Sequence, residues 1–136
     1  MKKEHYLVPV VAGVVLKKDG KYLLVQEKQP AAFELWNLPA GKVDVGDTIA
    51  GTAIKEAKEE TGYDVRLLYK LPISQEVPDR APKHAFAAEI VGGDLNFPKD
   101  ELIDAKWFTL EEVKSMKGKL RDPWVLQCIE LVEAGQ

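Results

Sequence analysis

Apolar and polar residues alternate along this chain in short runs that predict strands separated by turns and helices. Residues 8–16 form a valine-rich apolar run that suits a buried strand, and the Asp19-Gly20 pair after it favours a hairpin turn. Residues 22–26 then return as a second strand. Gly92-Gly93 is expected to form a turn. Three further runs have strand character: residues 65–71, 84–90 and 106–108.

The clearest helix signal covers residues 48–61. Asp47 or Thr48 suits the N-cap, and Gly62 stands just past the end, where a left-handed residue closes many helices. At about 100° per residue, five small or aliphatic side chains share one arc and predict the face that packs on the core: Ile49, Ala50, Ala53, Ile54 and Ala57.

Two shorter helices are expected toward the C-terminal end. Thr109 and Glu112 form a capping box, and the Asp122-Pro123 pair starts a helix that reaches about residue 134. Residues 29–46 contain two prolines and two glycines and are expected to form an ordered loop. Strands mixed with helices, without regular βαβ alternation, predict an α/β (α+β) fold, a sandwich around a mixed β-sheet.

Composition narrows the class of protein. The 136 residues are 46% hydrophobic and 30% charged with a formal net charge of −3, which fits a globular protein and gives no electrostatic footprint for nucleic acid. The one cysteine, Cys128, excludes an internal disulfide. The apolar run at residues 7–16 is too short to span a membrane and lacks a signal-peptide cleavage site, so a cytoplasmic protein that does not bind membranes is expected.

Most of the acidity lies in one segment. Residues 44–64 hold six acids and two bases, a net charge of −4 that leaves the rest of the chain at +1. Within this segment Glu56, Glu59 and Glu60 share one face of the predicted helix. Glu56 and Glu60 repel each other one turn apart, and Glu59 and Glu60 lie in the last turn, where the helix dipole favours cations. Each of these placements costs roughly 0.2–1 kcal/mol.

Two interpretations of this acidic face remain open. In the first it is a solvated surface, on which Lys55 pairs with Glu59 one turn later. In the second it is a metal site, because a divalent cation such as Mg²⁺ or Mn²⁺ turns carboxylate repulsion into coordination. Gly41, in the Pro39-Ala40-Gly41 segment before the helix, permits a close backbone approach, so a loop carbonyl can complete the metal shell.

Residues 41–63 read GKVDVGDTIAGTAIKEAKEETGY and resemble the Nudix box, G-x5-E-x7-R-E-U-x-E-E-x-G-U, at full length and without a gap. Ala57 and Tyr63 suit its aliphatic or bulky positions. Asp47 stands in place of the first glutamate, and Lys55 stands in place of the arginine. The five fixed positions that match are Gly41, Glu56, Glu59, Glu60 and Gly62.

The flanks extend the resemblance to Nudix hydrolases, in the Trp-Asn-Leu-Pro-Ala-Gly segment at residues 36–41 and the Asp-Ala-Lys-Trp-Phe segment at residues 104–108. The resemblance implies a single Nudix domain over residues 1–136, built as an α/β/α sandwich. It implies Mg²⁺- or Mn²⁺-dependent hydrolysis of a nucleoside diphosphate linked to a further group. The family's brace between arginine and the first glutamate becomes Lys55 with Asp47, which keeps the signs but loses the bidentate fork. The metal-ligand set that it implies is Glu56, Glu59, Glu60 and the carbonyl of Ala40.

The remaining candidates are side chains for catalysis and substrate contact. Trp36 is a candidate for stacking on a substrate ring, with core packing as the alternative. A plain surface role is the alternative for every basic candidate and for Glu101. The candidates for accepting the proton of the attacking water are Glu59, Glu60 and the loop residue Glu101. The candidates for phosphate contacts are Lys42, Arg80 and Lys83.

The resemblance also bears on substrate and assembly. Residues 36–41 and 120–123 favour a nucleoside di- or triphosphate or a related small pyrophosphate as substrate. Pro78, 16 residues past Gly62, points instead to an ADP-ribose or nucleotide-sugar pyrophosphatase. A non-catalytic nucleotide-sensing Nudix module is a further alternative. A homodimer is compatible with the sequence, with Trp124 either at the interface or in the core.

Overall fold

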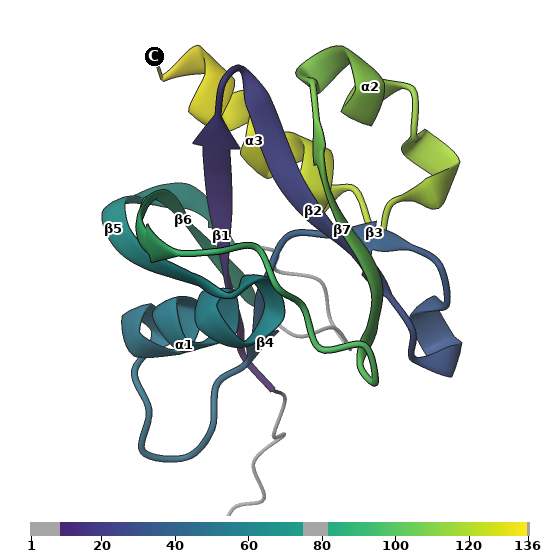
Figure 1. Cartoon of the computed structure of the whole chain (residues 1–136). Helices are drawn as coiled ribbons and strands as arrows, with labels where there is room; N and C mark the ends of the chain where they lie inside the picture. The colour runs from purple at the N-terminus through teal and green to yellow at the C-terminus, as the bar shows by residue number, and fades with distance from the viewer. Residues whose placement is uncertain (1–8, 75–81, 136) are drawn as a thin grey trace, which may run out of the picture.

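The structure, a computed structural model, describes residues 9–74 and 82–135. Its strands are β1 (Val11–Lys18), β2 (Lys21–Glu27), β3 (Trp36–Asn37), β4 (Ala40–Lys42), β5 (Tyr63–Ser74), β6 (Lys83–Gly93) and β7 (Leu102–Phe108). Its helices are α1 (Ile49–Thr61), α2 (Leu110–Lys114) and α3 (Trp124–Ala134), with 3-10 turns at Pro30–Ala32 and Lys117–Lys119 (Figure 1).

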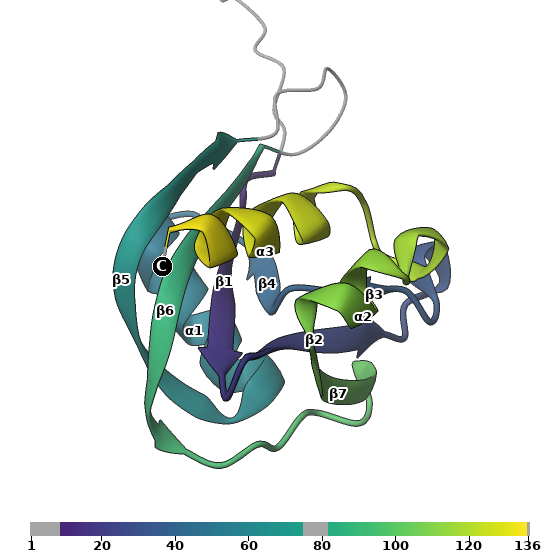
Figure 2. The same ribbon diagram turned by 90° about the horizontal axis from the view of Figure 1, so that it is seen from above.

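The strands form one mixed sheet in the order β3-β2-β1-β6-β5, to which β4 adds by pairing with β1 and β7 by pairing with β2. β1 and β6 run parallel, and the other pairs are antiparallel. α1 and α3 lie on opposite faces of the β1–β6–β5 part of this sheet (Figures 1 and 2). The predicted sandwich around a mixed sheet is therefore confirmed.

Alternate residues of β1 divide the core into two layers. Val15 packs with Trp124 and Ile129 beneath α3, whereas Val14 packs with Ala53 on the α1 side. Trp124 is 1% exposed, so its side chain belongs to the core. Within the described part of the chain, no helix has the length and apolarity needed to cross a membrane.

Several predicted boundaries and turns are confirmed. Asp19 and Gly20 both have positive φ, as a tight hairpin turn requires. Thr48 is the N-cap of α1, because its Oγ1 accepts from the N–H of Gly51 at 2.9 Å. Thr109 and Glu112 form both bonds of the capping box on α2. α3 starts one residue later than predicted, although the Asp122 carboxylate still accepts from the N–H of Trp124 at 2.8 Å.

Three predictions about local structure are wrong or incomplete. Residues 29–46 hold two short strands in place of an irregular loop, because their hydrogen-bond partners lie elsewhere in the sequence. Gly92-Gly93 ends β6 and pairs with β5 rather than forming a turn. Ile54 and Ala50, predicted to face the core, are exposed, with Ile54 at 41%. The buried face of α1 consists instead of Thr52, Ala53, Ala57 and Thr61.

The end of α1 generates a stability prediction. Gly62 has φ +82°, and a Cβ there would lie 2.3 Å from the carbonyl oxygen of Asp94. We expect Gly62→Ala to lower the free energy of unfolding by about 2–4 kcal/mol, since a left-handed backbone cost and a backbone clash add. Urea denaturation measures this change.

Gly46→Ala is the matched control, because Gly46 has φ +92° and a Cβ added there would meet open space. It should cost only the backbone term, about 1–2 kcal/mol. If both variants lose the same free energy of unfolding, the close approach of Gly62 to Asp94 does not contribute to the effect.

Candidate active site

The acidic end of α1 meets the β4 backbone at very short range. Glu60 Oε1 accepts a hydrogen bond from the N–H of Ala40 at 2.9 Å. A Cβ on Gly41 would lie 2.1 Å from Glu56 Oε1, so a side chain at position 41 would displace the Glu56 carboxylate from this backbone. The structure therefore brings Glu56, Glu60 and Ala40 together, as the sequence predicts.

The register of β4 determines the direction in which the backbone N–H and carbonyl of Ala40 point. The N–H of Val14 donates to the carbonyl of Pro39 at 3.0 Å, and the N–H of Val43 donates to the carbonyl of Val10 at 2.7 Å. Hydrogen-bonded pairs alternate with non-bonded pairs along an antiparallel ladder, which makes Ala40 and Gly13 a non-bonded pair. The N–H and the carbonyl of Ala40 thus both point away from β1, and the N–H reaches Glu60.

Burial and mutual repulsion disfavour the charged forms of these carboxyls. Burial, then the neighbouring Glu59 carboxylate, raise the pKa of Glu56 to about 7, although Lys55 opposes the shift. Burial likewise raises the pKa of Glu60 to about 8, and the charges of Glu56, Glu27 and Glu101 add to it against the hydrogen bond from Ala40. A bound cation would relieve these unfavourable terms.

Glu60 opens into a cavity of about 500 Å³, which we name the acidic hollow. Its charged lining consists of four acids and one base: Glu27, Glu60, Asp100, Glu101 and Lys28. The predicted loop residue Glu101 is thus brought to Glu60, whereas Glu59 is exposed on α1. Sequence reasoning missed Glu27, whose only signal was a charge directly after a predicted strand.

A second cavity of about 520 Å³ adjoins the first, and Glu27 and Gln29 line both. We name it the basic hollow, because its charged lining has three bases and two acids: Lys42, Lys83, Arg121, Glu27 and Asp122. Lys42 and Lys83, the predicted phosphate contacts, line this hollow together with Arg121, which the sequence did not indicate. Arg80 lies outside the described residues.

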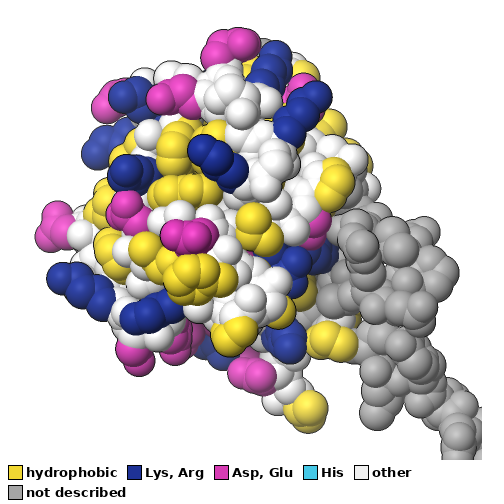
Figure 3. All heavy atoms as spheres, turned by 90° about the vertical axis from the view of Figure 1, so that its right-hand side faces the viewer, with side chains coloured by type: hydrophobic (Ala, Val, Ile, Leu, Met, Phe, Trp, Pro, Cys, Tyr) yellow, Lys and Arg dark blue, Asp and Glu magenta, His cyan; other side chains and the backbone are white. Residues whose placement is uncertain are grey.

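One face of the molecule shows no such separation of charge. On the face shown in Figure 3, acidic and basic side chains are interspersed with apolar ones, and neither sign dominates.

Among the described candidates, Glu56 and Glu59 line neither hollow, and neither does Trp36. Its side chain is 8% exposed and packs edge-to-face on Phe108, with ring centroids 4.9 Å apart. The core alternative therefore describes Trp36, and no substrate contact is assigned to it.

Lys55 takes the bracing position that the resemblance implies. Its Nζ lies 3.4 Å from Asp47 Oδ2 and 3.3 Å from Asp44 Oδ2. All three side chains are more than two-fifths exposed, so the brace is a solvent-screened pair of ion pairs and contributes little to stability.

The residues present fit a hard divalent cation in chemistry. Carboxylate oxygens of α1 and the outward carbonyl of Ala40 are the donors that Mg²⁺ and Mn²⁺ prefer. Among the described residues, no three acidic, histidine or cysteine side chains already converge as a closed ligand cluster. Mg²⁺ needs only one or two carboxylates, because waters and substrate phosphates fill its other positions. The donor set is therefore suitable but not preformed.

Comparison with known families identifies the class of this fold and site. The NUDIX domain family matches residues 7–128, and the chain belongs to this family. A solved NUDIX hydrolase from Nitrosomonas europaea superposes with a TM-score of 0.83 at 27% identity, over 93% of this chain and 89% of that one.

Three curated relatives are similar over most of this chain. Putative nudix hydrolase 1 of Caenorhabditis elegans is 34% identical over 82% of the chain, and the putative 8-oxo-dGTP diphosphatase of Bacillus subtilis is 34% identical over 69%. Phosphatase NudJ of Escherichia coli K12 is 31% identical over 93% of the chain. The matched part of this chain spans 32%, 61% and 84% of these three relatives' lengths, respectively.

The raised pKa values predict how the stability of the metal-free protein depends on pH. Glu56 and Glu60 bind protons more tightly in the folded chain than at their ordinary pKa of 4.5. Between about pH 4.5 and pH 8 the folded state therefore holds the extra protons, and these groups remove stability as pH rises. We expect Glu60→Gln, measured in EDTA, to raise the Tm at about pH 8.5 and to raise it less at about pH 5.5.

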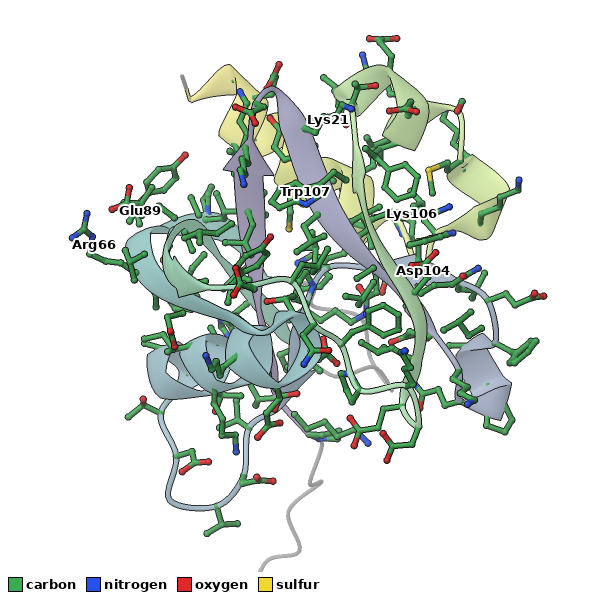
Figure 4. The ribbon with its side chains drawn as sticks, in the orientation of Figure 1. Lys21, Arg66, Glu89, Asp104, Lys106 and Trp107 are labelled. Carbon is green, nitrogen blue, oxygen red and sulfur yellow. The ribbon has the colours of Figure 1, made fainter. Side chains whose placement is uncertain are left out.

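Glu89→Gln is the control, since Glu89 pairs with Arg66 at the outer side of the sheet. This pair lies far from β7, whose first residue, Leu102, lines the acidic hollow (Figure 4). It should give no gain in Tm at either pH. A Glu60→Gln gain that is equal at both pH values would contradict the raised pKa.

Proposed function

We propose that this protein is a metal-dependent hydrolase that cleaves a phosphoanhydride bond, with a nucleoside di- or triphosphate or a related small pyrophosphate as substrate. The observation that carries the proposal is the meeting of the α1 carboxylates with the Ala40 backbone at the edge of the acidic hollow. The names of two relatives, an 8-oxo-dGTP diphosphatase and a phosphatase, support this substrate class.

In this proposal Glu56, Glu59, Glu60 and the carbonyl of Ala40 hold Mg²⁺ or Mn²⁺. The bound ion supplies charge neutralisation and polarises phosphate oxygens. Gly41 keeps the backbone close to Glu56, and the Ala40 N–H keeps the Glu60 carboxylate oriented. Both features place Glu56 and Glu60 beside the backbone of residues 40 and 41 before substrate arrives, which lowers the cost of completing the metal shell.

The attacking water loses a proton, and three carboxylates can accept it. Glu60 already accepts a hydrogen bond through Oε1, and Glu59 is exposed on α1. Glu101 lines the acidic hollow from the segment just before β7, outside α1. We therefore assign the proton acceptor to Glu101 and metal binding to the α1 glutamates. Lys42 and Lys83, beside the hollow, would contact the phosphates or the group attached to them.

The activity itself is tested with a substrate panel. The pure protein is incubated with Mg²⁺, and in parallel with Mn²⁺, and offered nucleoside di- and triphosphates, ADP-ribose, nucleotide sugars and thiamine pyrophosphate. We expect release of phosphate or a nucleoside monophosphate from at least one di- or triphosphate. Binding of a nucleotide without turnover of any member would favour the non-catalytic alternative and contradict hydrolysis.

Two variants separate metal binding from proton transfer. Glu60→Gln should abolish activity and also reduce the rise in Tm that millimolar Mg²⁺ gives the wild-type chain, because the ion binds only the folded site. Glu101→Gln should lower kcat by about 100-fold to 10,000-fold, the usual contribution of a general base, yet keep the Tm rise. Full activity in Glu101→Gln would remove its assigned role, and an unchanged Tm rise in Glu60→Gln would remove that of Glu60.

A further inference from the structure

The basic hollow is a second compartment of the candidate active site. It shares Glu27 and Gln29 with the acidic hollow, and Ala40 and Gly41 also line it. A substrate whose scissile phosphates lie at Glu60 therefore extends its attached group along the shared wall into this compartment. The chemistry of the lining then decides which attached group is accepted.

Arg121 is held rigidly at this compartment by its backbone. Its N–H donates to the carbonyl of Trp36 at 2.8 Å, and Leu120 forms an isolated bridge to Trp36. The next residue, Asp122, pairs with Lys83 in a contact whose two side chains are 8% and 13% exposed. The position of Arg121 is thus fixed on both sides by buried contacts.

The Arg121 guanidinium retains unused donors. Among the described residues its one ion-pair partner is Glu27, whose Oε2 lies 3.2 Å from Nε. That contact is an ion pair without a hydrogen bond, because Glu27 Oε2 has no hydrogen-bond partner in the described part of the chain, so the four N–H groups on the two terminal nitrogens are left for other acceptors. The side chain is 38% exposed, so these donors are accessible from the hollow. A planar guanidinium with free terminal nitrogens matches a carboxylate or a phosphate.

The rest of the lining favours an anion over a stacked ring. No aromatic side chain among the described residues lines the basic hollow, and Trp36 is buried in the core. Lys83 is compensated by Asp122, whereas Lys42 is exposed and has no ion-pair partner in the described part of the chain. On this lining Lys42 is thus an uncompensated cation, and Arg121 keeps free terminal N–H groups beside its ion pair with Glu27.

We propose that Arg121 is a specificity-determining residue that binds a second anionic group, a phosphate or a carboxylate, on the far end of the pyrophosphate substrate. This inference rests on the proposed function, because it takes the scissile bond to lie at the acidic hollow. Glu27 acts as a positioning residue that orients Arg121 through Nε. A nucleoside triphosphate carries such a group as its additional phosphate.

The test uses two pairs of pyrophosphates that differ by one anionic group. UDP-glucuronate carries a carboxylate that UDP-glucose lacks, and NADP⁺ carries a phosphate that NAD⁺ lacks. With Mg²⁺ we expect the wild-type protein to favour the anionic member of at least one pair by about tenfold in kcat/KM, the scale of one charge-assisted contact. The pair that shows the preference identifies which anion is bound.

Three variants assign the preference to Arg121. Arg121→Gln should bring the ratio within each pair close to one by weakening only the anionic member, and Arg121→Lys should retain part of it. Lys119→Gln should match the wild type, because Lys119 is exposed on the neighbouring 3-10 turn and lines neither hollow. A ratio within a pair is unaffected by the fraction of folded protein, so loss of stability does not imitate the result.

Calorimetric binding of the same four compounds to the Glu101→Gln chain with Mg²⁺ separates this inference from the proposed function. An anion preference in binding without hydrolysis by the wild type would contradict only the proposed function. Equal handling of both members in both pairs, a preference that survives Arg121→Gln, or no binding of any compound would overturn the role of Arg121.

Discussion

The hydrogen bond from the Ala40 N–H to the Glu60 carboxylate joins the two parts of the chain on which the candidate site depends. β4 is paired with β1 through one edge, so the N–H and carbonyl of Ala40, which β1 does not use, point from the other edge toward α1. Gly41 then lies so close to Glu56 that a side chain at position 41 would push the Glu56 carboxylate away. α1 is fixed in turn by its Thr48 cap and by Gly62, which contacts the backbone before β7. The position of each carboxylate is therefore set by backbone contacts.

This arrangement holds like charges close together where they are partly buried from solvent. Burial raises the pKa of both Glu56 and Glu60, and the carboxylates of Glu27 and Glu101 add to the repulsion at Glu60. Carboxylates near a helix C-terminus also oppose the helix dipole. A divalent cation bound between these carboxylates would relieve the same electrostatic terms. Beyond Glu27 the net charge of the cavity lining changes from negative to positive, and the basic hollow offers donors that suit the anionic remainder of a substrate.

The local signals of the sequence predicted the centre of this site well. Caps, helix periodicity and the spacing of Glu56, Glu59 and Glu60 all lie within one short segment, where local rules are strongest. Glu27 and Arg121 were missed, because they meet only through the pairing of β2 with β3 and the bridge from Leu120 to Trp36. Trp36 is buried for the same reason, since its neighbour Phe108 comes from distant β7. Two-residue β3 carries no periodicity from which such contacts could be read.

The central claim is that the α1 carboxylates and the Ala40 carbonyl form one divalent-metal site. The most direct measurement is a crystal structure of the wild-type protein grown with Mn²⁺, in which anomalous scattering locates the ion independently of any activity. The account predicts an anomalous peak between α1 and β4, within bonding distance of the Ala40 carbonyl and of at least one carboxylate among Glu56, Glu59 and Glu60. A peak at another cluster of acids, or no peak at this junction with Mn²⁺ in excess, would contradict it.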